Sequence, residues 1–280
     1  MPRLLWTGRH LLRSSDGIYT VPEGFRLQIP DDDYFGWMMA WGYFAPELGA
    51  LLRKYLRADD VFVDVGAHLG YIANFAAQLV GPSGLVLAID ADPHAFALLR
   101  ANTRLNEDAR IVPLEVAVSN RPGALQFNVA SQLGWSSAVG TWNGGSDSMT
   151  ITVPAVTLDA LVQEHLDPGC TPRLVKIDVE GFEPQVLAGA ESLLQSARTG
   201  WILEVHHEAL RANASSFRAL FDVFNATGHD VYWIQSGRRR FWHGRSASLT
   251  KVTNPARYDG LNGDIIAIPR SGGFDIRDDG

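Results

Sequence analysis

The amino-acid sequence predicts an α/β fold in which a largely parallel sheet is covered by helices on both faces. The first observation is that buried apolar segments alternate with helical segments from Val61 to Val116, as βα units do. The second is that glycine-containing turns follow two of the apolar segments, at Gly66 and Gly181. The third is that 280 residues with 46% hydrophobic content suffice for one such domain and an N-terminal extension.

Residues 1–58 form the expected N-terminal extension. An arm at Met1–Arg13 is expected to pack on the domain or on a second copy of the chain, so a homo-oligomer through the extension is one prediction. Val21–Pro30 alternates weakly and predicts a short hairpin. The aromatic run Tyr34–Phe44 is either a lid over a substrate pocket or a helix packed on the sheet. Pro46 begins an amphipathic helix.

The domain proper is expected at residues 59–270, followed by a tail at 271–280. Its first half alternates strand and helix, with Asp92 as an N-cap before Pro93. Right-handed crossovers then place the loops after these parallel strands on one edge, where ligands bind. The expected elements are strands at Val61–Val65, Leu85–Ile89 and Ile111–Val116, and helices at Leu69–Val80 and His94–Leu105.

The second half is less regular. A glycine-rich loop with tryptophans at 134–146 suggests a functional surface loop, and the basic turn Ser236–Arg245 suggests either an acidic-substrate site or solvated arginines. The expected strands are Gly123–Val129, Met149–Val153, one from Leu174 that ends at Asp178, Trp201–His207, Val231–Gln235 and Asp264–Pro269. The expected helices are Leu158–His165 after Thr157, Gln185–Gln195 and Ser215–Ala226.

Composition excludes several classes of protein. The net charge of −7 argues against a partner such as duplex nucleic acid. The single cysteine, Cys170, forms no intrachain disulfide and favours a reducing compartment, so we expect a cytoplasmic protein. No apolar run approaches the about 20 residues needed to cross a membrane, so no membrane association is expected.

The turn from Asp64 to Gly70 predicts the kind of ligand. Glycine lets the backbone approach a ligand closely, but the Asp64 carboxylate would repel a phosphate. An acidic residue instead suits a ligand with cationic and hydroxyl groups, such as S-adenosylmethionine. The absence of a complete G-x-G-x-x-G also favours this cofactor over a dinucleotide.

A second motif, Lys176-Ile177-Asp178-Val179-Glu180-Gly181, follows the same logic of strand and glycine turn. The next strand carries Glu204 and is expected to end in His206 and His207, which strand alternation would place on opposite faces. A histidine at a strand end is a candidate general base, although one of the pair is equally explained as a core residue.

With these motifs in view, the chain resembles the class I S-adenosylmethionine-dependent methyltransferases, and within them the FkbM-type methyltransferases, over about residues 43–269. The resemblance rests on Val61–Tyr71, Ile89–Pro93, Ala117–Ser119 with Gly123, and Val175–Glu183 with Glu204 and His206. The family usually has asparagine at the position of His68 and often glutamate at that of Asp90.

The resemblance implies a Rossmann-like seven-stranded sheet whose last strand, Asp264–Ile268, is antiparallel. It also implies that Asp90 binds the ribose of the cofactor and that Glu115–Ala117 flank the adenine. The cofactor-binding residues it implies are Asp64, Gly66, Ala67, Gly70, Asp90, Ala91, Glu115, Val116, Ala117 and Asp178.

The expected activity is transfer of a methyl group to a hydroxyl of a small molecule, of natural-product or sugar type. Asp178, Lys176 and His206 are the candidate catalytic residues. An oxygen-rich magnesium site is a further hypothesis, with Asp178, Glu180, Glu204 and His206 as candidate ligands. Alternatives are an N- or C-methyltransferase and a non-catalytic ligand-binding protein that retains the fold.

Overall fold

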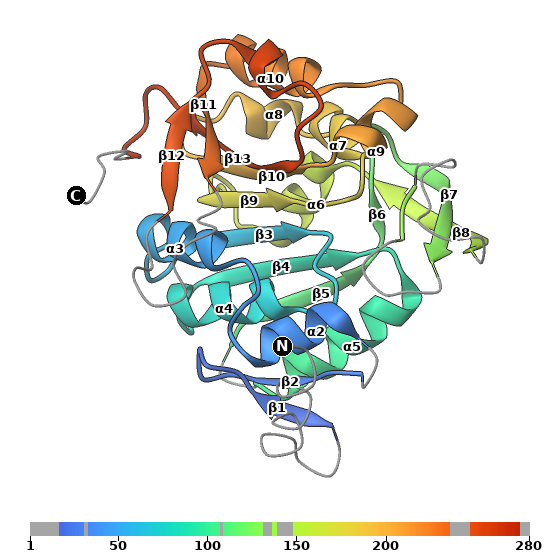
Figure 1. Ribbon diagram of the computed structural model, residues 1–280. Helices are drawn as coiled ribbons and strands as arrows, with labels where there is room; N and C mark the ends of the chain where they lie inside the picture. Colours follow the sequence, from blue (N-terminus) through green and yellow to red (C-terminus); the bar gives the residue numbers. More distant parts are fainter. Residues whose placement is uncertain are drawn as a thin grey trace, which may run out of the picture.

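The structure is a computed structural model that describes residues 17–30, 33–106, 109–130, 136–138, 148–235 and 247–274. A mixed sheet forms its centre, with helices on both sides (Figure 1). The expected α/β fold is confirmed. Within these residues the main sheet has the order β12 (Ser248–Lys251), β11 (His229–Gln235), β13 (Gly263–Pro269), β10 (Gly200–Val205), β9 (Leu174–Ile177), β3 (Val61–Val65), β4 (Leu85–Asp90) and β5 (Ile111–Glu115).

Strand direction follows the expectation. Strands β10, β9, β3, β4 and β5 are parallel to one another, and β13 lies antiparallel between β10 and β11. The seven strands implied by the resemblance are therefore present with the last one antiparallel. The short β12 pairs antiparallel with the outer edge of β11 and is an addition that the sequence analysis did not predict.

Alternate side chains of each central strand enter two different cores, as Phe62 and Val63 of β3 do. Because both faces are buried, the strands are apolar at successive positions. One face is covered by α3 (Pro46–Tyr55), α4 (Tyr71–Val80) and α5 (Pro93–Arg104), and the other by α6 (Leu158–His165), α7 (Glu183–Ala188), α8 (Glu191–Leu194) and α10 (Phe217–Ala226).

The described part of the N-terminal extension packs on the domain. Strands β1 (Ile18–Thr20) and β2 (Arg26–Gln28) form a hairpin whose first strand lies before the expected range Val21–Pro30, and Leu27 lies in the same core as α4 and α5. Asn102 of α5 and Asn106, just after this helix, accept hydrogen bonds from the backbone of β2: Asn102 Oδ1 lies 2.6 Å from Gln28 N and Asn106 Oδ1 lies 2.9 Å from Arg26 N. The domain boundary at residue 58 stays a prediction.

The direction in which the chain adds strands to the sheet reverses between the neighbouring strands β3 and β9. From β3 the chain moves outward through β4 to β5, whereas β9 leads the other way to β10. The carboxyl ends of β3 and β9 therefore border the crevice in which α/β proteins bind ligands. A second sheet follows β5 in the chain and lies on the side of the molecule to which the carboxyl ends of β3 and β9 point (Figure 1). Its strands are, in order, β6 (Ala117–Val118), β8 (Ser148–Val156) and β7 (Gly123–Ala130).

Among the helices in the described residues, none combines the length and the apolar character that a membrane span requires.

Candidate active site

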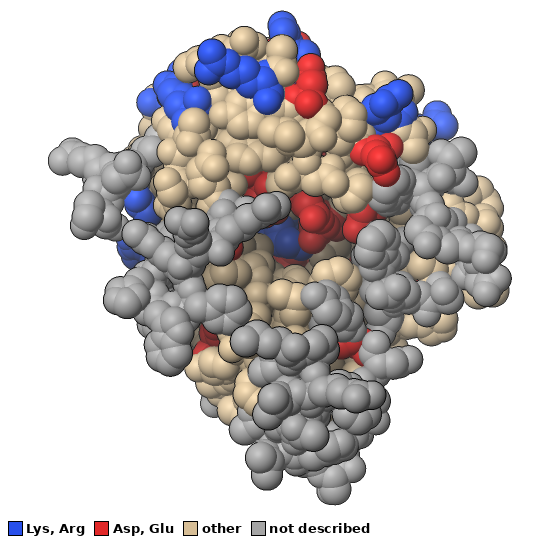
Figure 2. Space-filling view, in the orientation of Figure 1, with Lys and Arg blue, Asp and Glu red and all other residues tan. Residues whose placement is uncertain are grey.

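A cavity of about 290 Å³ opens at the carboxyl ends of β3, β4, β9 and β10. In the space-filling view, acidic side chains gather around a basic one in the hollow at the centre of the molecule (Figure 2). Of the residues expected to bind cofactor or to act in catalysis, the cavity is lined by Gly66, Ala67, Asp90, Ala91, Val116, Ala117, Lys176 and Asp178.

The turn after β3 is held by hydrogen bonds inside the protein. The N–H groups of Gly66 and Ala67 both donate to Ile89 O at 2.9 Å, and Gly66 adopts a left-handed φ of 79°. The backbone N–H groups at these two positions are therefore already satisfied. The turn shapes the cavity without offering these two donors to a phosphate, which agrees with the prediction of a cationic ligand.

Lys176 is the centre of a buried charge cluster. Its Nζ lies 3.1 Å from Asp64 Oδ1 and 3.2 Å from Asp178 Oδ2, and it donates to Gly66 O at 3.0 Å. Burial lowers the pKa of Lys176, but the charges of Asp178 and Asp64 outweigh it and raise the pKa above its usual range. Lys176 is therefore a cation that holds the ends of β3 and β9 together, and Asp64 lies beneath it, fully buried.

Asp90, at the end of β4, lines the cavity and can accept further hydrogen bonds there. Its Oδ2 accepts a hydrogen bond from His68 N at 2.7 Å and its Oδ1 one from Asp92 N at 2.9 Å. Each carboxylate oxygen has two lone pairs, so each retains one for a ligand. Burial raises the pKa of Asp90 to about 7, although both backbone hydrogen bonds lower it.

His68 lies where the family usually has asparagine, and the backbone conformation at this position suits both residues. Its φ is 53°, in the left-handed region where asparagine and histidine are both enriched. The side chain lines the cavity, and Nε2 is buried without a hydrogen-bond partner in the described part of the chain. Burial lowers the pKa of His68, although the charge of Asp33 raises it. The ring is therefore a neutral group that faces the cavity.

The His68→Asn variant is expected to retain the fold and the ligand affinity, because asparagine also accepts a left-handed backbone. The His68→Val variant is expected to lose about 1–2 kcal/mol of unfolding free energy. Thermal and urea denaturation of both variants measure this difference. Equal losses in the two would show that backbone conformation is not what selects the residue here.

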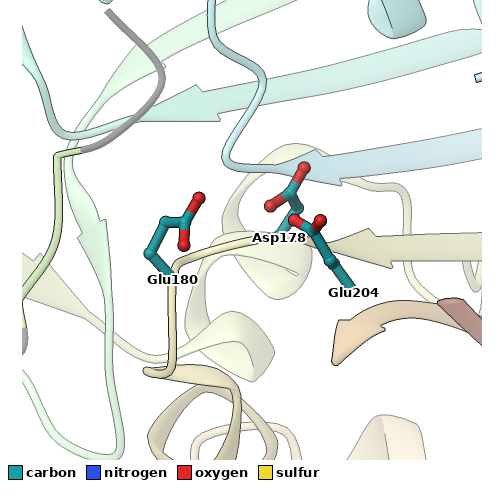
Figure 3. A group of neighbouring side chains, drawn as sticks. All are labelled: Asp178, Glu180 and Glu204. Carbon is teal, nitrogen blue, oxygen red and sulfur yellow. The ribbon is translucent and has the colours of Figure 1, made fainter. Parts of the chain in front are cut away.

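Three carboxylates from two strand ends and the turn between them converge beside Lys176. Ligand oxygens of Asp178, Glu180 and Glu204 all lie within 4.8 Å of one another (Figure 3). Asp178 and Glu204 share a hydrogen bond; the Asp178 charge raises the pKa of Glu204 well above its usual range. Burial raises the pKa of Asp178, but the charge of Lys176 and the Glu204 hydrogen bond lower it overall. One proton is thus shared by the pair and resides on Glu204.

Three of the four candidate metal ligands therefore meet in space, and His206 is not among them. Oxygen ligands of this kind suit Mg²⁺. An ion would have to displace the proton shared by Asp178 and Glu204, so the metal stays a prediction. Loss of activity after chelation, restored by Mg²⁺, is the result that would support it.

The expectation for the two histidines was wrong. Strand β10 ends at Val205, so His206 is the N-cap residue of α9 (His207–Ala212) and His207 is its first residue. Neither follows the alternation of a strand, and neither is among the described residues that line the cavity. The catalytic role of His206 stays a prediction.

Three expected cofactor residues also do not line the cavity. Asp64 is buried under Lys176, and Gly70 caps α4 with a φ of 89°. Gly70 packs against α5, since an added Cβ would lie 2.7 Å from Leu99 Cδ1. Glu115 is exposed at the end of β5, although its neighbours Val116 and Ala117 line the cavity.

The aromatic run forms one apolar wall of the cavity. Helix α2 (Tyr34–Ala40) contributes Phe35 and Met39, and the following turn contributes Phe44. Met39 is also buried in the core, so the segment packs on the domain as a helix and lines the cavity as well; a lid over a substrate stays a prediction. The structure describes residues 136–138 of the tryptophan loop, of which Ser136 and Ala138 line the cavity. The other residues of that loop and the basic turn at 236–245 lie outside the described residues.

Sequence reasoning missed Asp264 as a site residue. It stands on β13 directly opposite Glu204 in the antiparallel ladder and lines the cavity. The sequence signal was a single acidic residue at the start of an otherwise apolar strand. That signal gains meaning only once β13 is placed beside β10.

Comparisons with known proteins agree with this geometry. The chain is 30% identical over 156 residues to the hexuronic acid methyltransferase AglP of Haloferax volcanii, covering 56% of this chain and 60% of that protein. It is 27% identical over 164 residues to the protein-L-isoaspartate O-methyltransferase of Triticum aestivum, covering 57% of this chain and 65% of that protein. The matches thus span less than two thirds of each of these relatives.

Among solved structures, the FkbM methyltransferase of Methylobacillus flagellatus KT aligns with a TM-score of 0.42 at 12% identity. The alignment covers 95% of this chain and 58% of that chain. The family model described as "Methyltransferase FkbM domain" matches residues 64–231, more than half of the chain, and includes both motifs that border the cavity. This chain therefore belongs to the FkbM methyltransferase domain family.

Proposed function

We propose that this protein is an S-adenosylmethionine-dependent O-methyltransferase that acts on a hydroxyl of a small molecule of sugar or natural-product type. The observation that carries the proposal is the arrangement of Asp90 and Asp178 at the ends of β4 and β9, facing one cavity. Membership of the FkbM methyltransferase family supports the reaction. The relative named as a hexuronic acid methyltransferase supports a sugar-type acceptor.

The donor end of the cavity fits the cofactor chemically. Asp90 retains one lone pair on each oxygen, which suits two neighbouring ribose hydroxyls. Val116, Ala117 and Phe127 supply apolar surface next to it for a flat base. The acidic residues around Lys176 suit the positive charge of a sulfonium and an ammonium group. When bound, S-adenosylmethionine would supply an activated methyl group and a neutral thioether leaving group.

The acceptor end supplies orientation and a place for the proton. The side chain of Asp178 is 32% exposed and lines the cavity, so an acceptor hydroxyl can donate a hydrogen bond to it. Asp178 would take up the proton of this hydroxyl when its oxygen is methylated and would release that proton to solvent. Lys176 positions this carboxylate, and the nearby apolar wall of α2 limits access of water.

Isothermal titration with S-adenosylmethionine, followed by transfer of a labelled methyl group to a panel of hydroxyl acceptors, tests the proposal. Binding and transfer are expected, and Asp178→Asn is expected to lower the transfer rate at saturating donor about 10²-fold or more. Absence of donor binding to the folded wild-type protein would contradict the proposed function.

Donor affinity is expected to rise with pH because of Asp90. Only the ionised carboxylate accepts both ribose hydroxyls, and burial raises its pKa to about 7. Affinity should therefore increase up to about tenfold from pH 6 to pH 8 if the protonated form binds weakly. The groups facing Asp90 are Asp92, Lys176 and His68.

Titrations of the wild type and of Asp90→Asn across this pH range measure the effect. The variant is expected to bind more weakly at pH 8 and to show no such rise, because asparagine does not ionise. A rise of the same size in the variant would assign the pH dependence to another group.

A further inference from the structure

The acceptor end of the cavity is lined by carboxylates from several separate segments. Asp178 follows β9, Glu180 lies in the turn after it, Glu204 stands on β10 and Asp264 on β13. The first three converge in Figure 3, and Asp264 is the partner of Glu204 in the strand register. Acidic side chains are visible in the hollow of Figure 2.

The positively charged side chain at this end, Lys176, already has partners within the protein. Lys176 is the one lysine or arginine among the described residues that line the cavity. Its ammonium group has three N–H donors, and Asp64, Asp178 and Gly66 O lie within 3.0 to 3.2 Å of it. The described lining therefore contains no uncommitted cation that could pair with an acidic group on an acceptor.

Asp264 differs from the other three carboxylates. Asp178 is paired with Lys176, Glu204 is hydrogen-bonded to Asp178, and Glu180 has interactions of its own. Asp264 is exposed, lines the cavity, and forms no hydrogen bond or ion pair through its side chain within the described part of the chain. Its two oxygens are therefore available to accept hydrogen bonds from a polyhydroxylated acceptor.

We infer that the acceptor is an uncharged polyhydroxylated molecule, such as a neutral glycoside, and that Asp264 selects it against an acceptor bearing a carboxylate. This inference rests on the proposed function and deepens it. Hydroxyl groups donate hydrogen bonds to the carboxylates, whereas a uronate would bring a like charge to the same cavity, where the described lining holds no free lysine or arginine to pair with it. Discrimination by a repulsive charge of this kind is a common means of specificity.

Two matched probes test the charge alone. Methyl β-D-glucopyranoside and methyl β-D-glucopyranosiduronate share ring and hydroxyl groups but differ by –CH₂OH against –CO₂⁻. Release of S-adenosylhomocysteine gives kcat/KM for each at pH 8. At that pH Asp264 is ionised, since desolvation of its carboxylate and then the charge of Asp178 raise its pKa to only about 6. The neutral probe is expected to be preferred by at least about tenfold.

Two variants assign the preference to Asp264. Asp264→Asn is expected to narrow the preference several-fold, and Asp264→Lys to remove or reverse it. Glu164→Gln makes the same change of charge at an exposed position of α6 outside the cavity, and it is expected to leave the preference unchanged. Because Asp264 is exposed, these variants are expected to fold, which circular dichroism checks.

The outcomes separate this inference from the proposed function. A uronate used as well as or better than the neutral glycoside overturns the inference, and so does a preference that survives in Asp264→Lys. Donor binding without methylation of either probe overturns the neutral-glycoside assignment but leaves the donor assignment standing. If the donor does not bind, the proposed function fails. Saturation-transfer NMR of the two probes then still tests the inference about the acceptor. Equal or stronger binding of the uronate, or binding of neither probe, overturns it.

Discussion

Replacing Lys176 with methionine is expected to lower the free energy of unfolding by about 3–5 kcal/mol. The side chain is nearly buried and lies 3.1 Å from Asp64, which is fully buried. Methionine matches the length of lysine but carries no charge, so the Asp64 carboxylate would be left in the core without a partner. Urea denaturation followed by circular dichroism measures the loss.

Two comparisons make this prediction specific. The double variant Lys176→Met, Asp64→Leu removes both buried charges and is expected to recover most of the lost stability. Lys251→Met breaks an exposed ion pair with Asp230, 2.6 Å long, and is expected to cost at most about 1 kcal/mol. A loss for Lys176→Met no larger than that for Lys251→Met would show that the buried cluster does not hold β3 and β9 together.

Replacing Gly66 with alanine is expected to destabilise the protein and to abolish donor binding. The left-handed φ of 79° alone costs about 1–3 kcal/mol for a residue with a side chain. A Cβ at this position would also lie 1.8 Å from the backbone oxygen of Asp178. That oxygen belongs to the turn after β9, so relief of the clash must separate the two strand ends that border the cavity.

Gly228→Ala separates these two effects. Gly228 has a similar φ of 81°, but nothing lies within 4 Å of an added Cβ, so only the backbone term applies. Thermal denaturation and titration with S-adenosylmethionine of both variants give the comparison. Gly66→Ala is expected to lose more stability and all measurable donor affinity, whereas Gly228→Ala should bind normally. Equal behaviour would mean that the close approach of Gly66 to Asp178 has no role.

Several elements were predictable because their signals are local. Asp92 accepts hydrogen bonds from His94 N at 2.8 Å and Ala95 N at 3.5 Å, and Thr157 Oγ1 accepts one from Ala160 N at 3.2 Å, as expected of N-caps. The segment Val61–Val65 forms β3 with the bounds that its apolar run indicates. Caps and buried strands are encoded by neighbouring residues, so reading along the chain identifies them.

Other elements depended on contacts between distant residues. The single helix expected at Gln185–Gln195 is two helices, α7 and α8. At the break, Gly189 packs against Ser119, since an added Cβ would lie 2.1 Å from Ser119 O. The start of α8 is capped by Asp159 of another helix, whose Oδ2 accepts a hydrogen bond from Ser192 N at 2.8 Å. Neither neighbour is close in sequence, so local periodicity did not reveal the break.

The sequence by itself determined the α/β fold, the glycine turn at Gly66 and the acidic character of the site, because each follows from residue types at short spacing. Only the tertiary structure decided that Lys176 is a buried tie between Asp64 and Asp178, that His206 lies outside the cavity lining, and that Asp264 faces Glu204. These facts depend on which strands become neighbours. Strand neighbours are set by the packing of the whole sheet, which no local pattern records.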